Sequence, residues 1–577
     1  MFVLARWLAG IAAVVGILFS WGCVGVTGKP LPLQAQLTVA LAGGGSGTVT
    51  SAPAGINCGQ TCTANFSTGG TVTLTATPGT GMVFAGWSGA CTGTSTCTVT
   101  LNTAATTTAT FNATVRAITH IIFMAQENRS LDHYFGTMHD YWAKNGFKDQ
   151  PFDGLPQFNS PAGPAPTNPG CDPAFPWNPP SQTPDCTIDK ASPAVTSYHL
   201  QTMCLENLSP SWNESHVDFS YFDPTDSKNQ FVGDGFVYTA AHDGRNQTPP
   251  FHDVDGIRAM GYYDGNDLNY YHFMASSFGT SDRWFSPVMT RTQLNRMYLL
   301  AATSHGHAYP LNDSHSPQLP DPIIFQLLQQ AGITWKIYVH PGPNGATDPQ
   351  SLFNRSYINQ FIYGNVILQQ FPQNLVPISQ YLTDVQNGTL PQVSYIEPAS
   401  DVALDEHPSD TDNPSPPNVQ GGAQYVASLI NPLMTSSSWP NSIFVFTFDE
   451  FGGLYDHVPP QKSVSPDGIG PTDLHTGDVC TKMSGPTCDF SYTGYRVPLI
   501  VISPFSKKNF VSHLAMDYTA ILKFIETRFG LPNLTKRDAA QPDLAQEFLD
   551  FVNVPWKTPP TPPNQNMNGA CYLDHLP

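Results

Sequence analysis

The sequence predicts an α/β protein with a mainly parallel central sheet, preceded by a small all-β domain. Residues 35–114 are rich in Thr, Gly, Ser and Ala and nearly free of charge. From about residue 117 onward, short apolar runs alternate with helical patterns. The length of 577 residues also exceeds one typical domain. We therefore expect an all-β module at 35–114 and a large α/β domain at 117–577.

The first residues have the pattern of an export signal. Arg6 precedes an apolar run from Trp7 to Trp21, which is too short for a comfortable transmembrane span. Residues 1–23 are therefore expected to be a signal peptide. Lipid attachment at Cys23 is an alternative, although the residues before it suit that cleavage poorly. We expect an exported protein that is extracellular, periplasmic or attached to the cell surface.

The eleven cysteines agree with an oxidising compartment. Pairs that are close in sequence can close small loops, and we expect the disulfides Cys58–Cys62, Cys91–Cys97 and Cys480–Cys488. Zinc binding is the competing interpretation of the first four cysteines, although their spacing is not that of a tight knuckle. The sequence does not connect the remaining four, which are Cys171, Cys186, Cys204 and Cys571.

The all-β module contains short alternating stretches separated by Gly, Pro and Asn, at 37–41, 72–76, 97–101 and 107–111. This pattern is typical of strands joined by tight turns. The run Phe84-Ala85-Gly86-Trp87-Ser88-Gly89 and its flanking cysteines resemble the small bacterial β-repeat modules of cell-surface proteins. No side chains here form a catalytic set, so we expect a spacer or an adhesive module that associates with the cell surface.

The large domain contains short, apolar and β-branched runs that predict buried parallel strands, at 118–124, 334–339, 393–396, 443–448 and 497–502. Helical patterns lie between or after them, at 322–330, 424–434 and 518–529. In such sheets ligands bind beyond the carboxyl ends of the strands. The polar residues that follow each strand are therefore the candidates for a functional site.

Three predicted strands end in clusters of oxygen-bearing residues. Glu127-Asn128 follows 118–124, and Asp449-Glu450 follows 443–448. The strand 393–396 is followed by Glu397 and then by Asp405-Glu406-His407. Crowded carboxylates repel each other unless a cation lies between them. These ligands suit one divalent ion such as Ca²⁺, Mg²⁺ or Mn²⁺, and Zn²⁺ also accepts carboxylates.

A hydroxyl nucleophile is available where Thr290-Arg291-Thr292 opens a predicted helix. A threonine there is either a simple N-cap or a group placed beside a phosphate at the positive end of the helix dipole. A metal-bound threonine oxygen could attack phosphorus. The formal net charge of −19 argues against nucleic acid as a partner.

Several motifs resemble the bacterial phospholipase C and acid phosphatase family. The opening motif is His120-Ile-Ile-Phe-Met-Ala-Gln-Glu-Asn-Arg-Ser-Leu-Asp-His-Tyr-Phe-Gly136. Further blocks follow in the family's order at 198–200, 211–216, 295–299, 447–460, 495–504 and 511–513. Together they span residues 117–535, which is nearly the whole large domain.

The resemblance implies an alkaline-phosphatase-like core that holds a metal and a Ser or Thr nucleophile. By position it assigns the metal ligands Glu127, Asn128, Asp449 and Glu450, and Thr292 as the nucleophile and remaining ligand. It also assigns His216 and His407 to contact with the phosphoryl group or protonation of the leaving oxygen. The chain has Glu450 where the family often has Asp, and Arg291 where Pro is common, which keeps Thr290 as an alternative nucleophile.

The implied activity leaves the substrate open between two classes. A phospholipase C would cleave the glycerol-side phosphodiester of a phospholipid with peripheral membrane contact, and an acid phosphatase would cleave small phosphomonoesters. We favour the phospholipase because most relatives with these motifs carry that name. A non-catalytic cell-surface binding protein is the alternative from another class, and the loss of a metal ligand would have favoured it.

Other residues of the motifs have expected structural roles. Arg129 and Asp132 are expected to lock their loop through a buried ion pair, and Gly452-Gly453 to permit close backbone approach to the metal site. For Asp456-His457 a structural hydrogen bond and a role in the site are equally compatible with the sequence.

Overall fold

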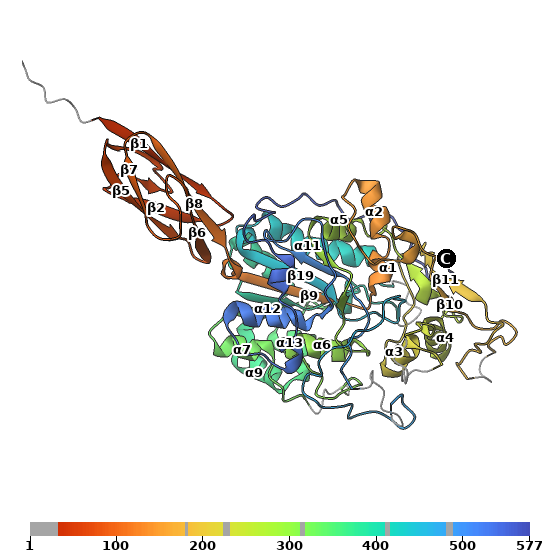
Figure 1. Ribbon diagram of the computed structural model, residues 1–577. Coiled ribbons are helices and arrows are strands. Elements are labelled where there is room, and N and C mark those ends of the chain that lie inside the picture. The colour runs from red at the N-terminus through yellow and green to blue at the C-terminus, as the bar shows by residue number, and fades with distance from the viewer. Residues whose placement is uncertain are drawn as a thin grey trace, which may run out of the picture. The chain divides into compact units, whose positions relative to one another are not determined.

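The computed structural model describes residues 33–178, 183–222, 231–311, 318–409, 416–480 and 489–576. The predicted signal peptide with Cys23, and the predicted disulfide partner Cys488, lie outside these ranges. The chain divides into two compact units, and the larger one contains residues 110–577 together with the short segments 41–47 and 77–85. The two parts are described separately below (Figure 1).

The N-terminal part is the predicted all-β region. Its described strands form two four-stranded sheets with the orders β4-β1-β8-β6 and β3-β2-β5-β7. Burial alternates along β1, where Ala35, Leu37 and Val39 are buried between more exposed neighbours, as expected for half-buried strands. The strands are β1 (Gln34–Ala42), β2 (Gly47–Ala52), β3 (Asn57–Cys58), β4 (Thr63–Ser67), β5 (Gly70–Pro78), β6 (Met82–Gly89), β7 (Cys97–Leu101) and β8 (Ala105–Ala113).

The large unit is built on a mostly parallel sheet, which confirms the predicted fold class. Within the described ranges this sheet has eight strands in the order β17-β16-β18-β9-β19-β20-β14-β21. The five strands from β17 to β19 are all parallel, and β20 runs antiparallel to both of its neighbours. The strands are β9 (His120–Gln126), β14 (Gly279–Ser281), β16 (Trp335–Val339), β17 (Leu375–Pro377), β18 (Val393–Ile396), β19 (Ser442–Phe448), β20 (Leu499–Ile502) and β21 (Phe510–Ser512).

Helices cover both faces of this sheet. In Figure 1, α5 and α11 lie on one side of β9 and β19, and α6, α7, α12 and α13 lie on the other. The helices are α1 (Leu131–Phe135), α2 (Met138–Asn145), α3 (Trp212–Phe219), α4 (Phe236–Asn246), α5 (Asn269–Ser277), α6 (Thr292–Ala301), α7 (Ile324–Gln330), α8 (Pro349–Phe353), α9 (Ile362–Gln370), α10 (Ile378–Asn387), α11 (Val419–Thr435), α12 (Thr519–Phe529), α13 (Lys536–Ala539) and α14 (Leu544–Phe548). None of the described helices combines the length and the apolar character needed to cross a membrane.

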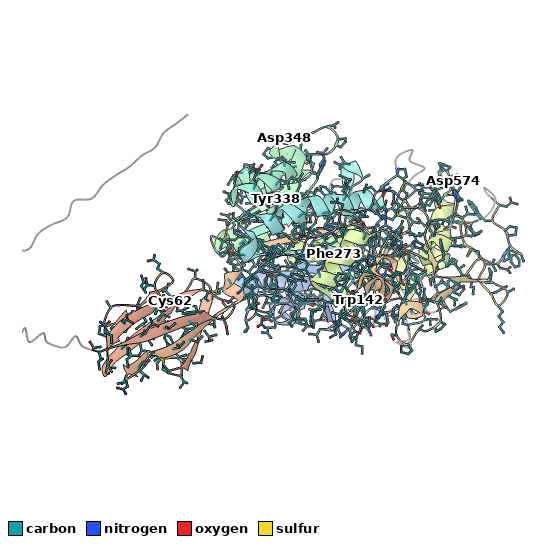
Figure 2. All side chains as sticks on the ribbon, turned by 90° about the horizontal axis from the view of Figure 1, so that it is seen from above. Cys62, Trp142, Phe273, Tyr338, Asp348 and Asp574 are labelled. Atoms are coloured by element: carbon teal, nitrogen blue, oxygen red, sulfur yellow. A yellow bond between two sulfur atoms is a disulfide. The ribbon has the colours of Figure 1, made fainter. Side chains whose placement is uncertain are left out.

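The centre of the sheet is buried because its strands are largely apolar on both faces. All residues of β18, β19 and β20 are buried, which explains why these runs show no alternation in the sequence. Figure 2 shows side chains filling the large unit, among them Trp142 of α2 and Tyr338 of β16. The indole N–H of Trp142 donates to the hydroxyl of Ser276 at 2.8 Å, so even this buried polar group has a partner.

In the part of the large unit that the structure describes, three short strand pairs lie outside the large sheet. They are β10 (Thr167–Pro169) with β11 (Ala194–Thr196), β12 (Tyr198–His199) with β13 (Gly261–Tyr262), and β15 (Trp284–Phe285) with β22 (Met516–Asp517). The excursion that contains β10 and β11 lies between α2 and α3 in the chain. It also carries one of the disulfides of the large unit.

Four disulfides have both of their cysteines among the described residues. The expected disulfides Cys58–Cys62 and Cys91–Cys97 are present, so the zinc interpretation of these four residues is wrong. The four cysteines that the sequence left unconnected form the pairs Cys171–Cys186 and Cys204–Cys571. The last pair ties the C-terminal segment to the loop after β12.

Two disulfides whose cysteines are all described in the large unit provide a test of their contribution to stability. Cys204–Cys571 spans 367 residues and Cys171–Cys186 spans 15. Because a longer closed loop restricts the unfolded chain more, replacing Cys204 and Cys571 by Ser should lower stability by about 5 kcal/mol, against about 3 kcal/mol for the Cys171/Cys186 double variant. Calorimetric melting in non-reducing buffer measures both. Equal Tm shifts would contradict this explanation.

Candidate active site

The adjacent parallel strands β9 and β19 bring the four predicted oxygen ligands together. The last residues of the two strands lie opposite each other, so Glu127-Asn128 and Asp449-Glu450 leave the sheet side by side. The Oδ1 atom of Asp449 accepts hydrogen bonds from the backbone N–H of Asn128 at 2.9 Å and of Glu450 at 2.8 Å. All four side chains are buried. The strand register alone therefore concentrates three carboxylates and an amide at one place.

Gly452 allows this close packing. It has φ of +72°, and a Cβ atom there would lie 2.5 Å from the carbonyl oxygen of Asn128. Its N–H donates to Oε2 of Glu450 at 2.6 Å. The predicted close backbone approach is confirmed for Gly452. Gly453 instead packs against Leu208, where a Cβ atom would lie 2.8 Å from the leucine side chain.

Thr292 is the first residue of α6 and completes the cluster. Its hydroxyl donates to Oε2 of Glu127 at 3.2 Å and to Oδ1 of Asn128 at 3.3 Å. The alternative, Thr290, is fully buried, and its hydroxyl donates to the carbonyl of Ala308 at 2.8 Å. Thr292 is half-buried, whereas the carboxylates beneath it are buried. Of the two threonines, Thr292 is the one that the structure brings to the predicted ligands.

Arg296 is a site residue that the sequence reasoning missed. It is fully buried, its Nη2 atom donates to Oε1 of Glu127 at 2.8 Å, and its Nε atom lies 3.5 Å from Oδ2 of Asp449. Its guanidinium group also lies over the ring of Tyr357, 4.7 Å from the centroid. A signal was available, because Arg296 follows Thr292 by four residues and therefore projects from the same face of the helix.

The pKa values of the buried carboxylates reflect their burial and the repulsion between their like charges. Burial and the Glu127 charge raise the pKa of Asp449 well above its usual range, and burial above all raises the pKa of Glu450 to about 8. Burial also acts to raise the pKa of Glu127, but Arg296, His407 and hydrogen bonds outweigh it and lower that pKa. One arginine therefore does not balance three carboxylates.

The donors fit a divalent cation. Oδ2 of Asp449 and Oε1 of Glu450 are buried and have no hydrogen-bond partner among the described residues. Carboxylate, amide and hydroxyl oxygens are the ligands that hard divalent ions prefer. A dication would supply the charge that the cluster lacks. Within the described ranges, two other acidic groups with a histidine could also hold a metal, and they are Asp132/Asp456/His457 and His199/Asp264/Asp267.

A cavity of about 680 Å³ opens above this cluster. Thr292 and Glu127 line it together with Asp405 and His407. A neighbouring cavity of about 460 Å³ shares the lining residue Tyr357 with the first. Thr292 can therefore meet a ligand that enters from solvent, whereas Asp449 and Glu450 lie below the surface.

The two predicted histidines have different positions. His407 lines the cavity, and its Nδ1 lies 2.5 Å from the carbonyl oxygen of Pro408, so Nδ1 carries a proton and Nε2 is left for other contacts. His216, in α3, is fully buried with its Nδ1 2.6 Å from the carbonyl oxygen of Trp212. It does not appear among the described residues that line the cavity. Only His407 thus shares the cavity with Thr292.

The residues of the third predicted cluster, Glu397 and Asp405-Glu406-His407, do not all lie at the same place. Glu397 does not face the metal ligands, because its carboxylate accepts hydrogen bonds from the hydroxyls of Ser356 and Tyr395 at 2.5 and 2.8 Å. Asp405 lines the cavity, whereas Glu406 is fully buried. The sequence expectation that all these groups converge on one metal is wrong for Glu397.

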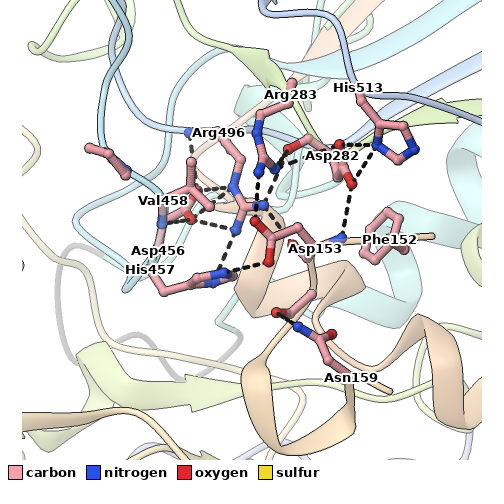
Figure 3. Close-up of polar contacts among 12 residues, drawn as sticks. Phe152, Asp153, Asn159, Asp282, Arg283, Asp456, His457, Val458, Arg496 and His513 are labelled. Carbon is pink, nitrogen blue, oxygen red and sulfur yellow. Dashed lines mark hydrogen bonds and ion pairs between the residues drawn. The ribbon is translucent and has the colours of Figure 1, made fainter. Parts of the chain in front are cut away.

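The expected Arg129–Asp132 ion pair is replaced by another pair. Figure 3 shows Asp456 and His457 beside Arg496. Asp132 pairs with Arg496 at 2.9 Å and with His457 at 2.6 Å. Arg496 also binds Asp456 at 2.6 Å, and all of these carboxylates are buried. Arg129 instead donates to the carbonyl of Glu406. The Asp456-His457 pair therefore belongs to a buried charge network, whose arginine already balances much of the charge of its carboxylates.

This network predicts a pH dependence of stability. Burial opposes the charged imidazole of His457, but Asp132 and hydrogen bonds to Asp132 and Asp153 outweigh it and raise the pKa to about 9. Since the folded pKa exceeds the unfolded value of about 6.5, the stabilisation is complete below pH 6.5 and is lost as pH rises through 9. We expect the Tm of the wild type to fall between pH 6.5 and 9. The Tm of His457→Gln should be lower at pH 6.5 and change less over the same pH range. Calorimetry at a series of pH values measures both profiles, and parallel profiles would rule out this role of His457.

Comparisons with known proteins agree with this geometry. The model of the Phosphoesterase family matches residues 118–532, and that of the Divergent InlB B-repeat domain matches residues 37–115. Phospholipase C A and Phospholipase C B of Mycobacterium tuberculosis are 27% and 28% identical, covering 77% and 78% of this chain and 79% and 80% of those proteins. Non-specific phospholipase C1 of Arabidopsis thaliana is 32% identical over 47% of this chain and 48% of its own length.

Solved structures add less than these sequence relatives. A protein of the alkaline phosphatase superfamily from Vibrio parahaemolyticus is 11% identical with a TM-score of 0.28, covering 47% of this chain and 63% of that one. With a TM-score this low, we draw no conclusion from the solved structures.

Proposed function

The chain belongs to the Phosphoesterase family, and on this basis we propose that it is a secreted phospholipase C that uses Thr292 as its nucleophile. Family membership makes it a hydrolase of phosphoester bonds. The observation that carries the proposal is the Thr292 hydroxyl, held within 3.3 Å of both Glu127 and Asn128 on the wall of a cavity. Relatives named phospholipase C, aligned over most of the chain, support the choice of a phosphodiester substrate.

Five residues would hold one divalent cation, and they are Glu127, Asn128, Thr292, Asp449 and Glu450. When bound, the cation supplies the positive charge that lowers the pKa of the Thr292 hydroxyl and stabilises the phosphoryl oxygens. Arg296 fixes one oxygen of Glu127 and leaves the other, Oε2, directed at Thr292. Ca²⁺, Mg²⁺, Mn²⁺ and Zn²⁺ are all compatible with this donor set.

The reaction has two steps. Oγ1 of Thr292 gives its proton to solvent and attacks phosphorus. The bond to the glycerol oxygen breaks while the imidazolium of His407 donates its Nε2 proton to the leaving diacylglycerol. Water then attacks phosphorus and gives a proton back to His407, and the bond to Oγ1 of Thr292 breaks and releases the phosphorylated headgroup. His216 is the second candidate for contact with the phosphoryl group. Stabilisation of the developing charge is the largest contribution, and proton donation to the leaving group adds to it.

Removal of the nucleophile is the direct test. Thr292→Ala should lose at least about 10³-fold in kcat, because no other hydroxyl of the described residues contacts both Glu127 and Asn128. Thr292→Ser keeps a hydroxyl and should retain part of the turnover. Metal analysis and circular dichroism on the same samples show whether the ligands and the fold remain. Full activity of Thr292→Ala would sink the assignment.

The substrate class can be tested with two chromogenic esters. The cavity wall carries Asp401 and Asp405, which disfavour the dianion of a phosphomonoester more than a zwitterionic diester. We therefore expect a higher kcat/KM for p-nitrophenylphosphorylcholine than for p-nitrophenyl phosphate. The opposite ratio would identify an acid phosphatase, and turnover of neither ester with divalent ions added would favour a non-catalytic binding protein.

We also propose that the enzyme works outside the cytoplasm. Four disulfides support this location, because such bonds persist in oxidising compartments. The N-terminal β-repeat region, proposed as a module at 35–114 ahead of the catalytic domain at 117–577, would attach the enzyme to a cell surface. Peripheral contact with a membrane follows from a phospholipid substrate.

A further inference from the structure

The loop Asp405-Glu406-His407 carries two residues to the cavity and turns the third inward. Asp405 and His407 line the cavity, whereas Glu406 is fully buried on the other side of the backbone. No step of the proposed reaction uses this buried carboxylate. Its surroundings therefore need another explanation.

The carboxylate of Glu406 is held by three donors from three elements. Oε2 accepts a hydrogen bond from the hydroxyl of Tyr134 in α1 at 2.5 Å. Oε1 accepts from the hydroxyl of Tyr271 in α5 and from Nε2 of Gln126 at the end of β9, the latter at 3.3 Å. A buried carboxylate requires this degree of hydrogen bonding. The Glu406 side chain thus works as an anchor for the loop.

The backbone of the same loop is fastened to the segment that follows β9. The N–H of Glu127 donates to the carbonyl of Asp405 at 3.0 Å, and Nε2 of Gln126 donates to the carbonyl of Leu404 at 2.9 Å. Arg129 donates to the carbonyl of Glu406. These bonds join the His407 loop to the residue that also contacts Thr292, so the two sides of the cavity share one support.

The conformation at Glu406 shows that the anchor opposes a local cost. Its φ is +72°, in the left-handed region that is unfavourable for a non-glycine residue. On the opposite side, a Cβ atom on Gly422 of α11 would lie 2.1 Å from Cγ of Glu406. The side chain therefore fits one position, between two tyrosines and a glycine of the helix.

We propose that Glu406 is a positioning residue that sets the place of His407 relative to Thr292. The carboxylate fixes the loop through Tyr134, Tyr271 and Gln126, and the loop presents His407 to the leaving oxygen. This role rests on the proposed function, since it concerns proton donation by His407. A misplacement of about 1 Å can reduce the rate about 10²-fold, so a firm anchor has a catalytic value.

The experiment compares two substrates of the purified full chain that differ in leaving group. A short-chain phosphatidylcholine releases an alkoxide that needs a proton, and p-nitrophenylphosphorylcholine releases a stable phenolate that does not. Glu406→Gln keeps the shape but replaces one acceptor oxygen by a donor. It should lower kcat about 10–100-fold with the phosphatidylcholine and change turnover of the p-nitrophenyl ester little. A purely structural role would lower both rates equally.

A double-mutant cycle tests whether Glu406 acts through His407. In the His407→Ala background, Glu406→Gln should add no further loss with the phosphatidylcholine. The metal content of each variant is measured, so that turnover can be expressed per intact metal site. Glu526→Gln is the matched control, because Glu526 is also a buried carboxylate but binds Asn533 and Leu534, and it should leave both rates unchanged.

Tyr271→Phe serves if Glu406→Gln does not fold, since it removes one donor and keeps the carboxylate. It should lower kcat with the phosphatidylcholine by a smaller factor than Glu406→Gln and again change turnover of the p-nitrophenyl ester little. Equal losses with both substrates, full additivity with His407→Ala, or no loss at all would overturn the positioning role. A wild-type chain that hydrolyses neither substrate would instead overturn the proposed function, so the two failures are distinguishable.

Discussion

The in-register parallel pairing of β9 and β19 is the constraint on which the rest of the site depends. Both strands are buried along nearly their whole length, and their last residues lie opposite each other. The next two residues of each chain segment must therefore share one small volume, and these are Glu127-Asn128 and Asp449-Glu450. A slip of one residue would turn these side chains to the opposite face and separate the ligands.

Charge balance is the second requirement, and arginines meet much of it. Arg296 lies against Glu127 and Asp449, while Arg496 lies against Asp132 and Asp456. Both guanidinium groups are fully buried. The two networks differ in one respect. In the first, two buried carboxylate oxygens accept no hydrogen bond from the described residues, whereas the second is completed by His457. This difference explains why a cation is favoured at the first and a structural role at the second.

The cavity wall is assembled from segments that are distant in the chain but fastened to a common base. The segment 126–129 contacts β19, the Glu406 loop and the first turn of α6. The end of β9 therefore fixes the positions of Thr292, of the Asp449-Glu450 pair and of His407 relative to one another. Precise mutual placement of such groups is what rate enhancement by orientation requires.

The sequence by itself determined the α/β class, the all-β region and the acidic residues at the strand ends, because these depend on local patterns. Apolar runs of four to seven residues, such as Val393–Ile396, form strands almost wherever they are buried, and the polar residues after them stand at strand ends.

Only the tertiary structure decided which groups meet. Arg296 and Glu406 gain their roles from partners more than 130 residues away, such as Glu127 and Tyr271. Glu397 follows the end of a strand as Glu127 and Asp449 do, but its carboxylate accepts a hydrogen bond from the hydroxyl of Ser356. The pairing of Cys204 with Cys571 is likewise a matter of packing. Periodicity reports the burial of one element, whereas contacts between elements depend on how whole layers pack.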